Sequence, residues 1–108
     1  MIENRRFLRI PFSVPLKFRK VDFMQEESSL SKDLSVKGIR FLSHRFVAVN
    51  THIKIELKTR EDSLVKFIAR TVWVRSLYAD ELYEVGAQIC EISQEGASYL
   101  CGFFGRRP

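Results

Sequence analysis

Alternation of apolar and polar side chains is the main pattern along this chain. Stretches in which every second residue is apolar predict strands that bury one face and expose the other. Such stretches cover residues 14–21, 52–58 and 83–92. Residues 64–77 have apolar side chains at both odd and even positions, so we expect that strand to be covered on both sides.

The segment between the first and second of these regions is more polar. Residues 22–31 are polar and acidic, which is typical of a turn or a long hairpin loop. Residues 31–42 are predicted to form one strand. Gly38 lies inside that strand, where glycine indicates a β-bulge or a close approach of another backbone segment.

The C-terminal segment has a different pattern, which predicts a short helix over residues 93–105. Ser93 is a suitable N-cap, and Glu95 suits the first helical turn. The helix would carry a rough apolar stripe, and its Phe103 and Phe104 are expected to pack against the strands. Strands without interleaved helices indicate an antiparallel barrel, which we expect to have six strands capped by this helix. The apolar residues of the stripe are Ala97, Tyr99, Leu100, Phe103 and Phe104.

The length and the net charge of the chain limit its size to one domain and favour certain classes of binding partner. With 108 residues the chain is the size of one domain, and its 45% hydrophobic and 29% charged residues are ordinary for a globular fold. The net charge of +5 favours an anionic partner such as a nucleotide, a nucleic acid or an anionic membrane. Arginines gather near both ends of the chain, at positions 5, 6, 9, 106 and 107.

Several functional classes lack sequence support. Cys90 and Cys101 belong to no metal-binding motif, so we expect reduced thiols that are buried or inert, and no metal site. His44 and His52 are interpreted as surface residues. Nothing matches a P-loop, a nucleophile elbow or an HExxH motif, which argues against an enzyme. The absence of a secretory leader and of an apolar run long enough to cross a bilayer predicts a cytoplasmic protein.

Two short motifs carry the specific chemistry. Arg5-Arg6-Phe7-Leu8-Arg9 has the form RxxxR, and Asp33-Leu34-Ser35-Val36-Lys37-Gly38 has the form DxSxxG. Together and in this order they resemble the PilZ domain family. The segments at residues 14–18, 38–41, 71–75 and 83–89 extend the resemblance over about residues 3–104.

The resemblance implies a PilZ-like barrel that binds the bacterial second messenger cyclic di-GMP. Arg5 and Arg9 would be the clamp, with Arg6 a secondary candidate, because a guanidinium fork can bind phosphate oxygens or guanine O6 and N7. Asp33 would accept hydrogen bonds from guanine N1–H and N2–H. Ser35 would offer a hydroxyl, and Gly38 would permit close backbone approach or an unusual φ.

Trp73 and two further positions refine this site. Trp73 is either a core or core-edge residue, or a ligand-stacking residue at the rim of the site. Arg75 faces either solvent or the ligand. Many relatives have another arginine directly before RxxxR, associated with a stacked pair of ligands; this chain has Asn4 there, which favours one ligand per domain.

The expected layout is a single domain over residues 1–108, with a ligand-clamping arm at 1–12, a barrel at 13–92 and a helix at 93–105. The arm would be mobile without ligand and would fold onto the barrel when the ligand binds, changing a surface that an unidentified downstream protein reads. Two alternatives remain: an adaptor with this fold that binds proteins without nucleotide, and a small nucleic-acid-binding barrel. The mostly core-type positions of the aromatic residues argue against nucleic acid.

Overall fold

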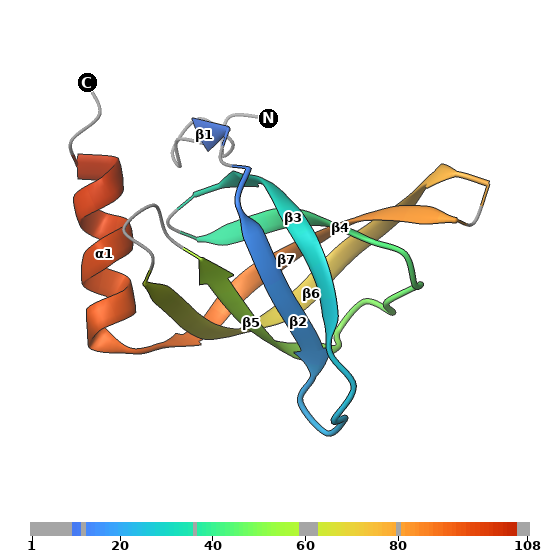
Figure 1. Ribbon diagram of the computed structural model, residues 1–108, viewed down its shortest axis with the longest axis horizontal. Helices are drawn as coiled ribbons and strands as arrows, with labels where there is room; N and C mark the ends of the chain where they lie inside the picture. Colours follow the sequence, from blue (N-terminus) through green and yellow to red (C-terminus); the bar gives the residue numbers. More distant parts are fainter. Residues whose placement is uncertain (1–9, 12, 36, 59–62, 80, 106–108) are drawn as a thin grey trace.

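The computed structural model describes residues 10–11, 13–35, 37–58, 63–79 and 81–105. They form seven strands followed by one helix (Figure 1). The elements are β1 (Ile10–Pro11), β2 (Pro15–Lys20), β3 (Glu27–Leu34), β4 (Gly38–Ser43), β5 (His52–Lys58), β6 (Leu64–Tyr78), β7 (Leu82–Ile92) and α1 (Gln94–Gly105).

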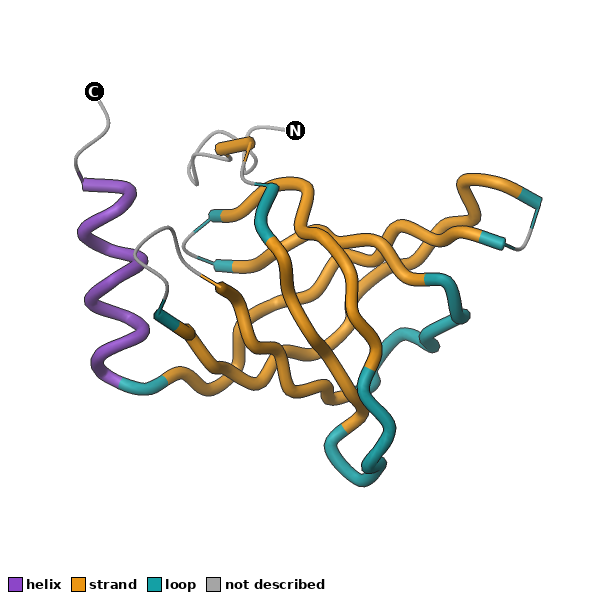
Figure 2. Tube along the Cα trace, in the orientation of Figure 1, coloured by secondary structure: helices purple, strands orange, loops and turns teal. Residues whose placement is uncertain are grey.

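Six of the strands close into an antiparallel barrel. Neighbouring strands follow the order β3-β2-β5-β6-β7-β4, and β4 also pairs with β3, which closes the ring (Figure 2). The short β1 adds to β3, with Ile10 opposite Leu34 and Pro11 opposite Asp33. The predicted six-stranded barrel with a C-terminal helix is therefore confirmed.

The core follows from the alternation along the strands. In β2 and β5 every second side chain points inward, so Leu16, Phe18, Ile53 and Ile55 are buried. The rings of Phe18 and Phe41 lie 4.8 Å apart across the barrel interior. Each large apolar side chain buried in this way stabilises the fold by roughly 1.5–3 kcal/mol.

The predictions for residues 22–42 were partly wrong. The loop is shorter than expected, because β3 already begins at Glu27. The single strand expected over residues 31–42 is in fact two antiparallel strands, β3 and β4, because the chain reverses direction between Leu34 and Gly38. The first part of β3 shows no apolar alternation, because its more buried positions are Glu27, Ser29 and Ser31 and its apolar Leu30 is exposed.

The prediction that residues 64–77 are covered on both sides was also wrong. The strand itself is present as β6, but Val72, Leu77 and Tyr78 are exposed. The pairing of β6 with β5 ends at Arg70, and beyond this point β6 pairs with β7 alone. The two strands form a long hairpin that projects from the barrel (Figure 1).

Helix α1 stands beside one end of the barrel (Figure 2). The predicted N-cap is present: the Ser93 hydroxyl oxygen accepts a hydrogen bond from the N–H of Gly96 at 2.9 Å. Leu100 is buried in the barrel core and Tyr99 packs against it, so these two side chains join the helix to the strands. The side chains of Phe103 and Phe104 lie outside the part of the molecule that the structure describes.

The two cysteines are free thiols and both are exposed, so burial, one of the two alternatives expected for them, does not apply. Cys90 is the extra residue of a β-bulge, since Ile68 and Ala69 pair with Glu91 and Ile89 on either side of it. Cys101 follows the buried Leu100 on the helix and points to solvent.

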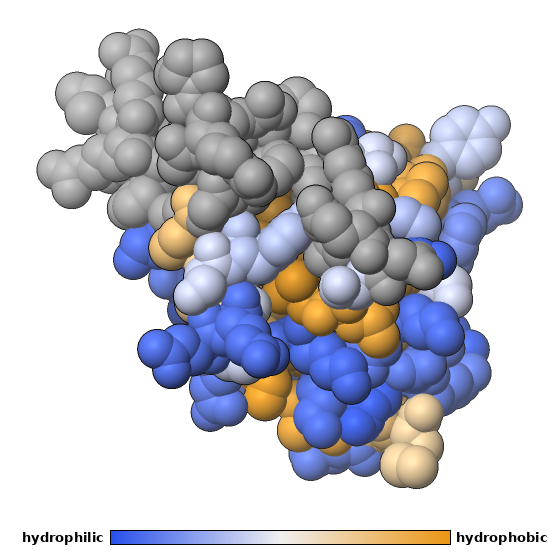
Figure 3. Space-filling view, turned by 60° about the vertical axis from the view of Figure 1, so that its left-hand side comes forward, coloured by the Kyte–Doolittle hydropathy of each residue, from blue (hydrophilic) through white to orange (hydrophobic). Residues whose placement is uncertain are grey.

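The face seen in Figure 3 is largely polar over the described strands, with apolar side chains visible between the polar ones.

Candidate functional site

The DxSxxG motif forms the turn between β3 and β4. The Ser35 hydroxyl oxygen accepts hydrogen bonds from the N–H groups of Lys37 and Gly38, each at 3.2 Å. The backbone N–H of Ser35 donates to the carbonyl oxygen of Gly38 at 2.9 Å. Ser35 is thus buried and engaged with the backbone, so its structural contribution is to shape the turn.

Gly38 is required by a close approach of two strands. A Cβ atom at this position would lie 2.3 Å from the carbonyl oxygen of Ala87 on β7. No glycine in the described part of the chain has a positive φ. Of the two reasons predicted for Gly38, close backbone approach therefore applies and an unusual φ does not. The predicted bulge at Gly38 is absent, since this residue begins β4 and pairs regularly with Gln88.

A β-bulge directs Asp33 to the outer surface of the barrel. Ser31 pairs with the buried Phe41, whereas Asp33 pairs with Arg40, so Lys32 is the extra residue between them. Regular alternation would place residues 31 and 33 on the same side of the sheet. Because of the bulge, Lys32 and Asp33 both reach the outer face, and Asp33 lies beside Arg40 with only 6% of its surface exposed.

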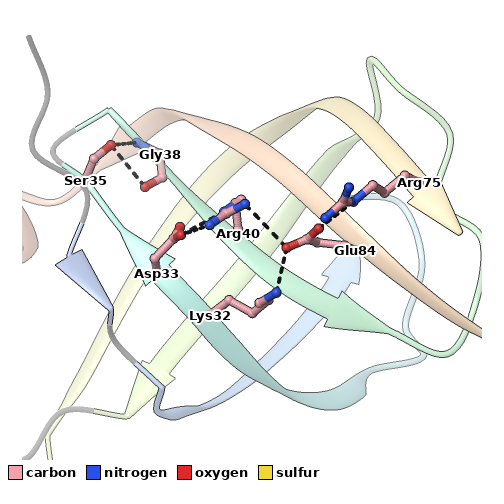
Figure 4. Close-up of polar contacts among 7 residues, drawn as sticks. All are labelled: Lys32, Asp33, Ser35, Gly38, Arg40, Arg75 and Glu84. Carbon is pink, nitrogen blue, oxygen red and sulfur yellow. Dashed lines mark hydrogen bonds and ion pairs between the residues drawn. The ribbon is translucent and has the colours of Figure 1, made fainter. Parts of the chain in front are cut away.

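Arg40 connects Asp33 to a second carboxylate (Figure 4). Its Nε and Nη2 groups both donate to Oδ2 of Asp33, the first over 2.8 Å. Its Nη1 lies 3.6 Å from Oε2 of Glu84 on β7. The hydrogen bonds to Asp33 are the main cause that raises the pKa of Arg40 above its ordinary value. Arg40 therefore stays charged and is held between two acidic side chains.

Glu84 is the buried centre of this charged cluster. Its side chain is fully buried, yet Lys32 Nζ lies 3.1 Å from Oε2 and the Nε of Arg75 donates to Oε1 at 2.8 Å. Burial by itself raises the pKa of Glu84, but the contacts with Lys32 and Arg75 and the charges of Lys32 and Arg40 outweigh it. The pKa of Glu84 lies below its ordinary value as a result, and the carboxylate is ionised at neutral pH.

Trp73 lies on the same outer face. The strand register places Asp33, Arg40, Gly86 and Trp73 side by side across β3, β4, β7 and β6, and we call these four residues the Asp33–Trp73 row. With neighbouring strands about 4.8 Å apart, the row spans about 14 Å. A Cβ atom at Gly86 would lie 2.3 Å from the indole ring, so the ring of Trp73 rests on a backbone without a side chain.

The position of Trp73 also depends on a bulge. Thr71 is buried and pairs with Ala87, while Trp73 pairs with Gly86, so Val72 is the extra residue. Trp73 is 37% exposed and does not belong to the buried barrel core. Trp73 is therefore not a core residue, and its role as a core-edge or ligand-stacking residue stays a prediction.

The whole arginine motif, with Arg5, Arg6 and Arg9, lies outside the described residues, as does Asn4. Chain continuity nevertheless connects Arg9 directly to Ile10, the first residue of β1. Since β1 pairs with the end of β3, the segment that follows the RxxxR motif lies against Asp33 of the DxSxxG motif.

Other predicted features can be located as well. His44 and His52 are exposed, as expected. Arg75 has a largely exposed side chain but also pairs with Glu84, so it combines a solvent-facing position with a place in the charged cluster. Among the described residues, no group of histidine, cysteine and acidic side chains is arranged to hold a metal ion. No described helix is both long enough and apolar enough to cross a membrane.

The sequence matches the model of a known family over almost its whole length. The PilZ domain model covers residues 3–103. The chain belongs to the PilZ domain family. No curated protein shows significant similarity to this PilZ domain.

Solved structures share the fold at low sequence identity. The motility inhibitor MotI/DgrA of Bacillus subtilis superimposes with a TM-score of 0.75 at 13% identity, covering 95% of this chain and 52% of that one. The PilZ domain of Escherichia coli YcgR, solved with c-di-GMP, gives 0.67 at 14% identity, covering 89% and 85%. The MrkH–c-di-GMP complex of K. pneumonia gives 0.73 at 12%, covering 93% and 49%. This PilZ domain thus spans about half the length of MotI/DgrA and MrkH.

Sequence reasoning missed three members of the charged cluster, namely Lys32, Arg40 and Glu84. The period-2 pattern gave Glu84 an outward direction, which is correct, and outward positions are normally solvated. It is buried instead because cationic side chains from β3, β4 and β6 converge on it. No signal within a single sequence indicates which distant strands supply those side chains.

Proposed function

We propose that this PilZ domain is a non-enzymatic cytoplasmic receptor for cyclic di-GMP. The ligand would bind between the segment that precedes β1 and the outer surface of β3, β4, β7 and β6. The pairing of Pro11 with Asp33 is the observation that carries the proposal, because the chain shortly after the arginine motif then lies against the first residue of the DxSxxG motif. The c-di-GMP complexes of YcgR and MrkH, which share the fold, support this ligand.

The chemistry of the candidate residues suits a cyclic dinucleotide. Arg5 and Arg9, with Arg6 as a further contact, would clamp the two phosphates and the purine faces, since guanidinium groups bind phosphate bidentately and stack on aromatic rings. Asp33 would accept from the guanine N–H groups. The remaining contacts would come from the turn shaped by Ser35 and Gly38 and from the exposed indole of Trp73.

The signal would pass through the N-terminal arm. Phosphate binding would neutralise the arginines and order the arm on the barrel, and an unidentified partner protein would recognise the altered surface. Hydrogen exchange of the arm amides checks this step. Saturating ligand should slow exchange in residues 2–9, and unchanged exchange would refute the relay while leaving ligand binding intact.

Isothermal titration calorimetry tests the receptor itself. Wild-type protein should bind cyclic di-GMP at one ligand per chain, in keeping with Asn4, and should not bind GTP comparably. An Arg5→Ala/Arg9→Ala variant should lose this binding. Arg106→Ala/Arg107→Ala is the matched control, because it removes the same charge from the other end of the chain and should retain affinity. Absence of binding to the wild-type protein would refute the proposed function.

A further inference from the structure

The guanidinium of Arg40 is held in place from two sides. Two of its N–H groups are directed to one oxygen of Asp33, and its Nη1 faces the buried carboxylate of Glu84 at 3.6 Å. Glu84 is in turn fixed by Lys32 and Arg75. Moving Arg40 away would leave Asp33, which is almost fully buried, without this charged partner. Arg40 is therefore a rigid part of the surface next to Asp33.

This arrangement leaves hydrogen-bond donors available on Arg40. A guanidinium carries five N–H groups, of which two are directed to Asp33. The distance of 3.6 Å to Glu84 exceeds that of an N–H···O hydrogen bond, so this contact is electrostatic. One third of the Arg40 side chain is exposed.

Arg40 is better suited to a neutral acceptor than to a phosphate. Its positive charge is already paired with Asp33, and an incoming phosphate would be repelled by this carboxylate. A carbonyl oxygen of a base meets no such repulsion. Guanine offers this acceptor as O6, whereas adenine has an amino group at the same position that would face the donors of Arg40.

Asp33 and Arg40 together present the pattern that complements guanine. A carboxylate accepts N1–H and N2–H, and an adjacent N–H donor matches O6, as in the pairing edge of cytosine. Trp73 lies two strands from Arg40 in the same row and offers an exposed ring face for stacking. Building on the proposed function, we propose that Arg40 is a specificity-determining residue that donates to guanine O6 beside Asp33, while the arm arginines take the phosphates.

The test compares two arginines that share the same buried partner. Arg40→Gln and Arg75→Gln each remove one positive charge next to Glu84, but only Arg40 contacts Asp33. Because a hydrogen bond from a charged donor is lost, Arg40→Gln should weaken cyclic di-GMP binding on the order of tenfold to hundredfold in calorimetry. Arg75→Gln should change the affinity much less. Equal weakening by both variants would mean a general charge effect and would overturn the proposal.

Isotope-edited infrared spectroscopy identifies the ligand atom. With cyclic di-GMP labelled with ¹³C at C6 and present at saturation, the guanine C6=O stretch should move to higher frequency in Arg40→Gln than in wild type, because O6 loses a charged donor. The phosphate stretches should stay in place. A shift of the phosphate bands with an unchanged carbonyl band would instead assign Arg40 to a phosphate, contrary to the proposal.

The possible failures are distinguishable. If wild-type protein does not bind cyclic di-GMP, the proposed function fails and this inference with it. If wild type binds and Arg40→Gln binds equally well, only the role of Arg40 is refuted. Thermal unfolding checks that each variant is folded, and Arg40→Lys, which keeps a charge beside Asp33 but lacks the planar fork, serves if the glutamine variant is not. The lysine variant should also weaken binding.

Discussion

Replacement of Glu84 by glutamine should destabilise the fold, although the change is nearly isosteric. The carboxylate is fully buried and receives Arg75 at 2.8 Å and Lys32 at 3.1 Å, with Arg40 at 3.6 Å. The Glu84→Gln variant keeps one acceptor oxygen but loses the negative charge. Its new NH₂ group is a hydrogen-bond donor that faces cationic donors. The cation next to this NH₂ group therefore loses its acceptor.

The magnitude follows from the two short contacts. Hydrogen bonds to a charged group contribute about 1.5–3 kcal/mol, against about 1 kcal/mol for neutral pairs. Weakening the contacts of Glu84 with Lys32 and Arg75 should therefore cost about 2 kcal/mol in the free energy of unfolding. The loss stays below the roughly 3–5 kcal/mol for breaking a fully buried pair, because the cations are 33–63% exposed and can regain water.

Urea denaturation of wild type and Glu84→Gln at pH 7 measures this difference. The midpoint should fall with an unchanged m-value, and Tm should drop by about 10 °C, since 1 kcal/mol corresponds to roughly 4–8 °C in a domain of this size. Glu56→Gln is the matched control. Glu56 also lies on a barrel strand, but it is one-third exposed and only 4.0 Å from Lys66, so its loss should cost well under 1 kcal/mol.

The pH dependence provides a second check. Because the pKa of Glu84 is lowered in the folded state, its contribution is present above the unfolded pKa and is lost as pH falls through the folded pKa. The stability difference between wild type and Glu84→Gln should thus be largest near neutral pH and shrink as pH falls below the ordinary glutamate range, about 4.3. Equal stability of the two proteins at pH 7, or a difference that does not change on acidification, would contradict the reasoning.

Three further substitutions test the fold around the site. Gly38→Ala should lower the free energy of unfolding by about 1–3 kcal/mol in urea denaturation, because its Cβ would collide with the backbone carbonyl of Ala87; a neutral result would show that β4 and β7 separate easily. Gly86→Ala should displace the indole of Trp73 and shift its fluorescence emission, which is readable because the chain has one tryptophan; an unchanged spectrum would argue against the ring resting on Gly86. Ser93→Ala removes the acceptor for a first-turn N–H of α1 and should lower stability by about 1 kcal/mol in thermal melts, and an unaltered Tm would mean that the cap is replaced by water.

Local sequence rules located most elements of this PilZ domain. The strand predicted over residues 52–58 coincides with β5, and residues 83–92 differ from β7 by one residue. These strands bury one face against a single core, so their side chains alternate and the period is visible in the sequence. The N-cap at Ser93 could also be predicted from the sequence, because an N-cap depends only on residues within the first helical turn.

The sequence predicted the motif of the candidate site, but it did not predict how the residues of that motif are arranged. The Asp/Ser/Gly set was recognised, but its Ser35 and Gly38 build a turn between two strands where one continuous strand was expected. The alternation of apolar and polar residues does not reveal this turn. Its hydrogen bonds come from the Ser35 hydroxyl, and Gly38 is needed only because β7 lies next to it.

The sequence by itself determined the barrel class, the inward faces of most strands and the charged motifs, since these depend on local spacing. The tertiary structure alone decided which outward side chains meet. Single extra residues at Lys32 and Val72 reverse the side on which Asp33 and Trp73 emerge, and a bulge exists only relative to the partner strand. The burial of Glu84 likewise follows from cations on three other strands, because strand register joins positions that lie up to 52 residues apart in the chain.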